Sequence, residues 1–308
     1  MSEKIYDTII IGGGPAGYTA ALYSTRAGLD TLVLEKFSAG GQMTQTSTID
    51  NYPGFEEGID GFSLGFKMQQ GAERFGAVTM QTEVLSVDLN ANPKRIVTDS
   101  GEFFSKTVII ATGADHKHLG VDKEDALIGR GVGYCAACDG MMFRGKTVAV
   151  VGGGNSAAAD ALLLSKICAK VYVIVRRDVM RATKIYHEPL MRAENVEFKW
   201  NSQVKELIHG MKISAVRIEN KEGESEEIAL DGLFISIGRS PATAIFKDQL
   251  TLDESGYIIA DESTRTNIPG VFAVGDVRTK VLRQIVTAAA DGAVASHYAE
   301  QYLAENGL

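Results

Sequence analysis

The chain has 308 residues, of which 45% are hydrophobic, so it can bury an ample core, and its length predicts two domains. A formal net charge of −8 provides no basic surface for nucleic acid or an acidic membrane, and we expect small molecules or proteins as partners. Three cysteines are too few for a disulfide framework, and neither a signal peptide nor a membrane-spanning segment is expected, which predicts a soluble, cytoplasmic protein.

The first predicted element is a βαβ unit at residues 8–36, which read TIIIGGGPAGYTAALYSTRAGLDTLVLEK. An apolar strand leads through three glycines into an Ala/Leu-rich helix and a second apolar strand. Gly12, Gly14 and Gly17 form GxGxxG, whose glycines let the backbone approach a pyrophosphate at the helix N-terminus. Glu35 lies 23 residues after Gly12, where a carboxylate can bind an unphosphorylated ribose. The pattern predicts a site for FAD or NAD.

Two apolar strands are expected to be the exits between domains. One ends on Ala111, Thr112 and Gly113, and the other ends on Gly238 and Arg239 before Pro241. After Pro241 the chain returns through GVFAVGDV and a helical stretch at its C-terminal end. The predicted fold class is α/β, with two Rossmann-like nucleotide-binding domains, the second inserted in the first. The expected boundaries are 1–114 and 245–308 for the first domain and 115–244 for the second.

Residues 134–140 read YCAACDG and raise the question of a metal clamp, a structural staple or a redox switch. The small number of cysteines argues against a staple. A structural zinc site usually has four cysteine or histidine ligands, and the remaining cysteine, Cys168, lies in an apolar stretch typical of a core residue. A CxxC pair that opens a helix favours a thiolate, which indicates a redox switch and no metal. His187 and His297 show no spacing that links them to the cysteines, and we expect surface or packing roles.

Residues 148–176, VAVVGGGNSAAADALLLSKICAKVYVIVR, repeat the first βαβ unit without a gap. Gly152, Gly154 and Ala157 form the variant GxGxxA. Val175 stands where the first copy has its carboxylate, and three arginines follow, which suits the 2′-phosphate of NADP. The arginines are Arg176, Arg177 and Arg181. The alternatives are a solvated basic loop and, for both copies, glycine turns without a nucleotide.

The chain resembles the low-molecular-weight thioredoxin reductases over essentially its full length. The shared motifs are GGGPAG, GGQM, DNYPG, ATG, YCAACDG, GGGNSA, RRDVMR, VFAVGD and RQIVTAA. The CxxCD between the two glycine loops is the specific one. The resemblance implies a homodimeric flavoenzyme that passes electrons from NADPH through FAD and an active-site disulfide to thioredoxin or a similar small dithiol protein.

The resemblance also implies roles for individual residues. FAD would contact Gly12, Gly14, Pro15, Ala16, Gly17, Glu35, Gly41, Gln42, Asn51, Thr112, Gly113, Gly275 and Asp276, with Arg283 and Gln284 closing over the flavin. NADPH would contact Gly154, Asn155, Ser156, Arg176, Arg177 and Arg181. Cys138 would face the flavin, Cys135 would be the interchange thiol, and Asp139 would be a general acid or base, the alternative for Asp139 being a helix-stabilising first-turn residue. Val175 and Ala137 depart from the family pattern of histidine and of threonine or proline.

A movement is expected because the CxxC and the second glycine loop belong to the same domain, whereas the flavin is bound mainly by the other. Nicotinamide and disulfide would both have to reach the flavin, which predicts rotation of the NADPH domain about its two connections. Three alternatives remain open. They are a peroxiredoxin-reducing subunit, a reductase fed by ferredoxin, and a non-enzymatic nucleotide or redox sensor.

Overall fold

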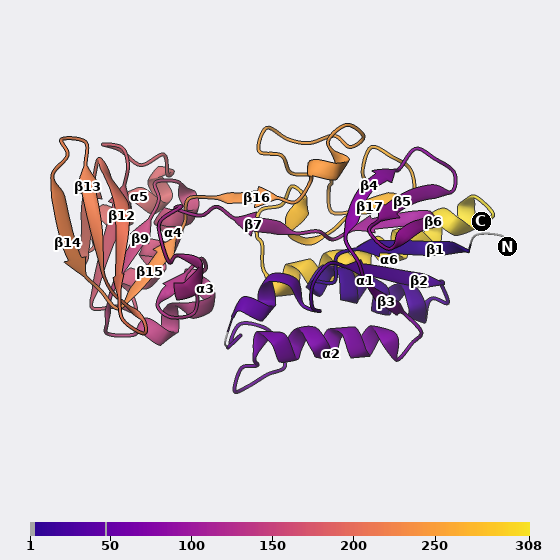
Figure 1. Cartoon of the computed structure of the whole chain (residues 1–308), viewed down its shortest axis with the longest axis horizontal. Coiled ribbons are helices and arrows are strands. Elements are labelled where there is room, and N and C mark those ends of the chain that lie inside the picture. The colour runs from indigo at the N-terminus through magenta and orange to yellow at the C-terminus, as the bar shows by residue number, and fades with distance from the viewer. Residues whose placement is uncertain (1–3, 47) are drawn as a thin grey trace. The chain divides into compact units, whose positions relative to one another are not determined.

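The computed structural model describes residues 4–46 and 48–308, and it divides the chain into two compact units (Figure 1). Unit 1 comprises Met1–Thr44, Tyr52–Asp115 and Ser240–Leu308. Unit 2 comprises Gln45–Asn51 and His116–Arg239. Within the described residues, no helix is long and apolar enough to cross a membrane.

Unit 1 is built on a seven-stranded sheet. A parallel set in the order β3, β2, β1, β6 continues with β17 beside β6, and β5 and β4 extend the sheet as antiparallel strands. The strands are β1 (Ile5–Ile11), β2 (Thr31–Glu35), β3 (Val78–Gln81), β4 (Val84–Asp88), β5 (Lys94–Thr98), β6 (Gly101–Ile110) and β17 (Val271–Ala273).

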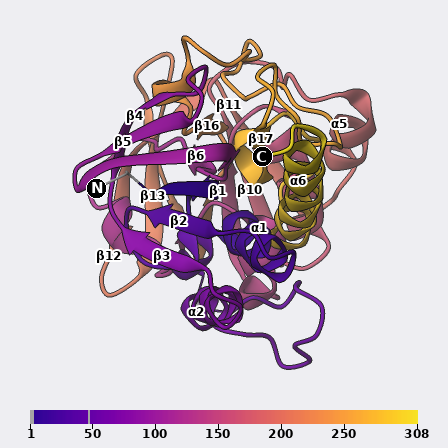
Figure 2. The ribbon, with the colours of Figure 1, turned by 90° about the vertical axis from the view of Figure 1, so that its right-hand side faces the viewer.

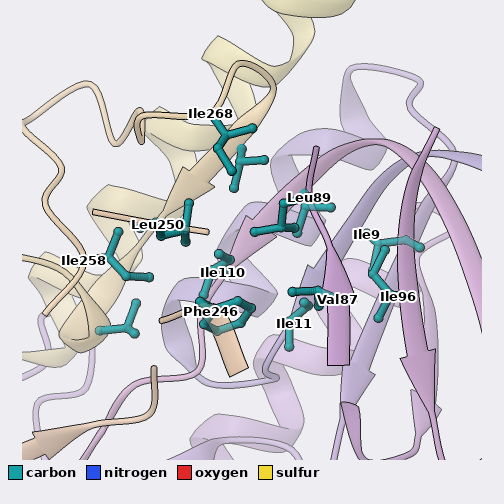
Figure 3. Close-up of a cluster of buried hydrophobic side chains, with 14 of the residues drawn as sticks. Ile9, Ile11, Val87, Leu89, Ile96, Ile110, Phe246, Leu250, Ile258 and Ile268 are labelled. Carbon is teal, nitrogen blue, oxygen red and sulfur yellow. The ribbon is translucent and has the colours of Figure 1, made fainter. Parts of the chain in front are cut away.

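Both faces of this sheet are buried, as alternation along β1 shows. Ile9 and Ile11 lie in one apolar cluster, and Ile10 lies in another. The first cluster joins the sheet to the C-terminal part of the chain through Phe246 and Ile258 (Figure 3). Strands buried on both faces read as continuous apolar runs, which explains the three consecutive isoleucines at residues 9–11.

Helices cover the second face of the sheet, and they are α1 (Pro15–Arg26), α2 (Gly61–Glu73) and α6 (Ile285–Glu305). In Figure 2, α1 and α6 lie beside each other along the sheet. They approach closely at Gly292, where a Cβ atom would collide with the backbone of Ala16 and Ala20. Ser24 donates a hydrogen bond to Ser296 across the same contact, at 3.0 Å.

Unit 2 contains a second parallel sheet in the order β11, β10, β9, β15, β8 and a separate antiparallel sheet of β12, β13 and β14. The strands are β8 (Val132–Gly133), β9 (Thr147–Val151), β10 (Lys170–Val175), β11 (Val196–Trp200), β12 (Ser202–His209), β13 (Ile213–Asn220), β14 (Ser225–Ala229) and β15 (Gly232–Ile235). Its helices are α3 (Ala136–Asp139), α4 (Asn155–Ser165) and α5 (Lys184–Met191).

Short elements complete the chain. The two connecting segments pair with each other as β7 (Ala114–His116) and β16 (Arg239–Pro241). Each connection carries a glycine with positive φ, Gly113 at 74° and Gly238 at 107°. The 3₁₀ turns are η1 (Gly41–Gln45), η2 (Asp125–Leu127), η3 (Gly140–Phe143), η4 (Ala244–Phe246) and η5 (Gly275–Val277).

The predicted fold class is confirmed. Each repeat of the sequence forms strand, helix and parallel strand, as β1–α1–β2 in unit 1 and β9–α4–β10 in unit 2. Unit 2 draws residues His116–Arg239 from between two segments of unit 1, which is the predicted insertion.

Candidate active site

The glycine loop of unit 1 leaves the N-terminus of α1 open. Gly12 has φ of 108°, and a Cβ atom there would collide with the carbonyl oxygen of Ala111, so only glycine fits. Gly14 precedes α1 without a side-chain cap, and a Cβ atom on it would meet no described atom within 4 Å. Pro15 occupies the first helical turn, where a missing N–H costs nothing. Uncapped N–H groups facing open space fit a pyrophosphate.

Glu35 is bound to the same loop. It is 9% exposed, its Oε2 accepts a hydrogen bond from the backbone N–H of Gly13, and its Oε1 accepts one from Phe37 at 3.0 Å. The carboxylate thus lies at the end of β2 beside the glycine loop, where the sequence predicts a ribose contact. Its position is held by backbone donors at both oxygens.

Several of the predicted flavin contacts gather around the start of α1. Gly40 donates a backbone hydrogen bond to the Gly13 carbonyl at 2.8 Å, which brings Gly41 against Gly14. Gly275 packs against Ala16, because a Cβ atom on Gly275 would lie 3.1 Å from the Cβ of Ala16. These contacts place η1 and η5 beside the open helix end.

Arg283 joins the beginning of α6 to η5. Its Nε donates to the carbonyl oxygen of Asp276 at 3.3 Å, and its Nη2 donates to that of Arg278 at 3.1 Å. Gln284, the next residue, caps α6, and its N–H donates to Thr287 Oγ1 at 3.1 Å. Asp276, Arg283 and Gln284 are therefore brought together within unit 1.

Other predicted contacts lie further along the chain. Gln42 donates its side-chain amide to the carbonyl oxygen of Ala114, and Thr112 Oγ1 donates to that of Ala242 at 2.9 Å. Gly113 follows in the connection to unit 2. Asn51 falls in the segment Gln45–Asn51, which is grouped with unit 2.

A buried charged cluster beneath η5 was not found by sequence reasoning. Asp291 on α6 accepts hydrogen bonds from the Gly275 N–H, from Arg278 and from Lys280. Burial by itself would raise the pKa of Asp291, but the hydrogen bonds and positive charges of Arg278 and Lys280 together lower it. The sequence feature that could have indicated this cluster is the spacing of Asp291, which lies three residues after Ala288 and four before Ala295. It therefore shares the buried face of the helix with them.

The glycine loop of unit 2 repeats the geometry of the first. Gly152 has φ of 148°, and a Cβ atom on Gly154 would meet no described atom within 4 Å. Asn155 Oδ1 accepts the Thr183 N–H at 2.8 Å, and the Arg181 N–H donates to the Gly153 carbonyl at 2.6 Å. The loop that carries Arg181 is therefore bound directly to the glycine loop.

The two copies differ at the last residue of the second strand of each βαβ unit. Val175 is 2% exposed and packs against Gly153. In the first copy, Glu35 lies against Gly13 in the same way. Arg176 and Arg177 follow and are exposed, as is Ser156 in the first turn of α4. The second site therefore lacks a carboxylate beside its loop and presents guanidinium groups instead.

The two cysteines form a disulfide between Cys135 and Cys138, with their Cα atoms 5.2 Å apart. Cys135 is the N-cap of α3, and its carbonyl accepts the N–H groups of Cys138 and Asp139, each at 3.1 Å. Ala137 is exposed between them. The short helix closes the four-residue loop that the bond requires.

Asp139 follows the disulfide and is half-buried. Its Oδ2 lies close to Gly133, since a Cβ atom there would be 3.3 Å from it. Burial raises the pKa of Asp139 from its ordinary value of 3.8 to about 6. A carboxyl group with this pKa can both hold and release a proton near neutral pH.

A second perturbed carboxyl group in unit 2, Asp160 on α4, was also missed. Burial raises its pKa to about 6, although Ser236 donates a hydrogen bond to it and Arg239 lies near. The sequence feature that could have indicated it is a single acidic residue inside the apolar helix that follows the glycine loop.

Cys168, His187 and His297, for which no catalytic role is expected, have other surroundings in the structure. Cys168 is buried in the core of unit 2, and burial raises the pKa of its thiol to about 11, which confirms the expected packing role. His187 faces the ring of Phe198, and His297 faces that of Tyr298. Among residues 4–46 and 48–308, no group of three His, Cys, Asp or Glu side chains is arranged to hold a metal ion.

Comparisons with known proteins agree with this geometry. The family described as pyridine nucleotide-disulphide oxidoreductase matches residues 6–292. A thioredoxin reductase of Listeria innocua is 46% identical over 305 residues, which cover 98% of this chain and 95% of that protein. A solved thioredoxin reductase of Streptococcus pyogenes has a TM-score of 0.91 at 44% identity and covers 99% of this chain and 100% of its own. One from Lactococcus lactis, described as in an FR conformation, has a TM-score of 0.70 at 43% identity and covers 97% and 99%.

The comparisons also bear on the groups that the chain uses, because this family and these relatives imply a flavin and a pyridine nucleotide. The resemblance inferred from the motifs is confirmed across nearly the whole length. The chain belongs to the pyridine nucleotide-disulphide oxidoreductase family, in its low-molecular-weight thioredoxin reductase branch.

Proposed function

We propose that the chain is a thioredoxin reductase that takes electrons from NADPH and delivers them, through FAD and the Cys135–Cys138 disulfide, to thioredoxin or a similar small dithiol protein. The observation that carries the proposal is the disulfide itself. It closes a short helix in the unit that also holds a GxGxxA loop, and the relatives that match nearly the whole chain are thioredoxin reductases.

FAD is proposed for unit 1. The open N-terminus of α1 would hold its pyrophosphate, Glu35 its ribose, and η5 with Arg283 and Gln284 the remainder of the group. When bound, the flavin would accept a hydride from the nicotinamide and pass two electrons to the disulfide. This placement is supported by three chain segments that meet at the uncapped N-terminus of α1, namely the end of β2, η1 and η5.

NADPH is proposed for unit 2. The open end of α4 would hold its pyrophosphate, while Arg176, Arg177 and Arg181 would bind the 2′-phosphate. The absence of a carboxylate at Val175 removes a charge that would repel that phosphate. The arginines' exposure leaves them free to contact an incoming ligand.

The cysteines are proposed to divide the thiol chemistry between them. After reduction, the Cys135 thiolate attacks a sulfur of the oxidised partner and forms a mixed disulfide, and the partner's other sulfur leaves as a thiolate. Cys138 then attacks Cys135, which restores the internal disulfide and releases the reduced partner. Asp139, with its pKa raised to about 6, would supply and recover the proton at Cys138.

The proposal assigns the FAD-binding domain to 1–114 with 245–308 and the NADPH-binding domain to 115–244. Both glycines with positive φ in the connections, Gly113 and Gly238, can absorb dihedral changes, which supports rotation of one domain about the two strands. A crosslink that locks the domains should preserve one half-reaction and abolish the other. Survival of both half-reactions would contradict rotation.

A homodimer and a cytoplasmic location complete the proposal. The dimer rests on the family resemblance. The location follows from the proposed reaction, because an enzyme that keeps a protein dithiol reduced belongs in a reducing compartment. Analytical ultracentrifugation of the flavin-loaded protein tests the dimer.

Anaerobic mixing tests the activity directly. The flavin-loaded protein should lose its visible flavin absorbance on addition of NADPH and regain it when oxidised thioredoxin follows. The Cys138→Ser variant should keep its flavin and still bleach, but should not reduce thioredoxin. A protein that never binds flavin, or that recolours equally well without either cysteine, would refute the proposal.

A further inference from the structure

The residue immediately before the redox pair, Tyr134, is fixed from two directions. Its ring stacks on His116 with centroids 4.5 Å apart and an interplanar angle of 19°. Its hydroxyl donates a hydrogen bond to Glu124 Oε1 at 2.7 Å and lies 3.1 Å from His118 Nδ1. One aromatic side chain therefore links the disulfide to three residues that precede it in the chain.

Glu124 is the centre of this arrangement. Its side chain is 4% exposed, and besides the Tyr134 hydroxyl it accepts the backbone N–H groups of Leu119 at 3.0 Å and Gly120 at 2.9 Å. A buried carboxylate is tolerated only when such donors satisfy it. Removing the phenol hydroxyl would leave Glu124 with one donor fewer in a buried place.

The protonation states keep the contacts intact at neutral pH. Burial, followed by the hydrogen bond to Glu124, raises the pKa of Tyr134, so the phenol keeps its proton and remains a donor. Burial lowers the pKa of His116 to about 4, with Arg239 and His118 adding to the effect. The ring that stacks on Tyr134 is therefore neutral.

The arrangement also reaches the connection that leads into the long segment of unit 2. His116 is the last residue of β7 and the first residue of the segment His116–Arg239, and Tyr134 directly precedes Cys135 in the chain. Cys135 itself has an extended backbone, with φ of −142° and ψ of 98°, at the N-cap of α3. Tyr134 thus links the segment that carries the disulfide to the C-terminal end of β7, one of the two connecting strands.

We propose that Tyr134, held by Glu124 and His116, is a positioning residue that keeps the Cys135 sulfur in place when the disulfide opens. The inference rests on the proposed function, in which Cys135 is the interchange thiol. A reduced pair whose sulfurs remain close re-forms its bond more readily, since proximity raises the effective concentration of one thiol at the other. Tyr134 therefore favours the disulfide and holds Cys135 ready for its partner.

The test measures the dithiol–disulfide equilibrium of the flavin-loaded protein against glutathione buffers, with alkylation to count free thiols. Tyr134→Phe keeps the stacked ring and removes only the hydroxyl. One net hydrogen bond corresponds to about fivefold in an equilibrium constant, and this is the upper limit of the effect because the hydroxyl holds Glu124 before and after the disulfide opens. We therefore expect the variant's disulfide to be up to about fivefold easier to reduce. Tyr134→Leu, which also loses the stack, should exceed this shift.

Tyr172→Phe is the matched control. Tyr172 is a half-buried tyrosine of the same unit, on the face of β10 that joins the antiparallel sheet, and its variant should behave as the parent protein. A second readout is the rate at which iodoacetamide alkylates Cys135 in a Cys138→Ser background, which should change in Tyr134→Phe and not in Tyr172→Phe.

Equal equilibria and equal alkylation rates for the parent protein and Tyr134→Phe would overturn the positioning role. Neither readout requires NADPH or thioredoxin. If the parent protein fails to pass electrons to thioredoxin, the proposed function falls while these measurements still decide the role of Tyr134.

Discussion

Asp291 Oδ2 accepts the backbone N–H of Gly275 at 2.8 Å, which binds the N-terminal part of α6 to the turn that carries Asp276. The same oxygen accepts Arg278 Nε at 2.9 Å and Lys280 Nζ at 2.8 Å, while Oδ1 accepts Arg278 Nη2 at 2.8 Å. Arg278 is 1% exposed and Asp291 is 6% exposed. One carboxylate therefore pairs with two buried cations and holds η5 beside the proposed flavin site.

Replacing Asp291 by Asn should destabilise unit 1 and weaken flavin retention together. Breaking one partner of a buried ion pair leaves an uncompensated charge and costs about 3–5 kcal/mol. Chemical denaturation of the flavin-free protein gives the stability change, and the flavin absorbance after gel filtration gives retention.

The exposed pair of Lys4 and Asp30 provides the matched control for Asp291. Their side chains are 55% and 43% exposed at a distance of 2.9 Å, and exposed pairs contribute about 0–1 kcal/mol. Asp30→Asn should therefore change little. Similar losses in both variants would show that burial of the Asp291 cluster has no special weight.

Arg176 and Arg177 should determine the choice of nicotinamide. Changing both to Gln removes charge-assisted hydrogen bonds of about 1.5–3 kcal/mol each, so KM for NADPH should rise by at least about 100-fold while KM for NADH stays the same. Steady-state assays with each cofactor measure this. Arg192→Gln, at the end of α5, is the control. An equal change for both cofactors would mean that the arginines do not bind the 2′-phosphate.

Asp139 should lower the free energy of unfolding as the pH rises. Because its folded-state pKa is raised to about 6, protonated Asp139 adds nothing unfavourable below about pH 4. The cost of burying its charge grows between about pH 4 and pH 6 and is complete above pH 6. Two pKa units correspond to about 3 kcal/mol. Relative to the parent protein, Asp139→Asn should gain up to that amount between pH 4 and pH 8, as denaturation at each pH will show.

Asp60→Ala is the control of opposite sign. The Asp60 carboxylate accepts the Ser63 N–H at 2.8 Å, which lowers its pKa, so the stability it contributes disappears as pH falls.

The same Asp139→Asn protein should reduce thioredoxin about 100-fold more slowly if the carboxyl moves the proton. Unchanged turnover would leave Asp139 with only a structural role.

Gly292 should tolerate no side chain. Its Cβ position overlaps the backbone of α1, and overpacking costs about 1–3 kcal/mol, so Gly292→Ala should lower the thermal midpoint. Gly71, inside α2, faces open space, and Gly71→Ala should raise stability by about 0.5–1 kcal/mol through the lower entropy of the unfolded chain. A stabilised Gly292→Ala would contradict the close approach of α1 and α6.

The sequence by itself determined the two βαβ units, because the strand, glycine loop and helix are local patterns of 29 residues each. It also determined the cysteine pair, since only two residues lie between its members and a single helical turn brings the sulfurs together. The family followed from these same local motifs.

Only the tertiary structure decided which distant groups meet. Asp291 and Gly275, or Tyr134 and Glu124, are joined by chain folding that no spacing predicts, and the raised pKa values of Asp139 and Asp160 depend on what buries them. Hydrogen bonds and desolvation act over a few ångströms of space. Their partners are therefore set by packing, whereas the backbone patterns are set by neighbours along the chain.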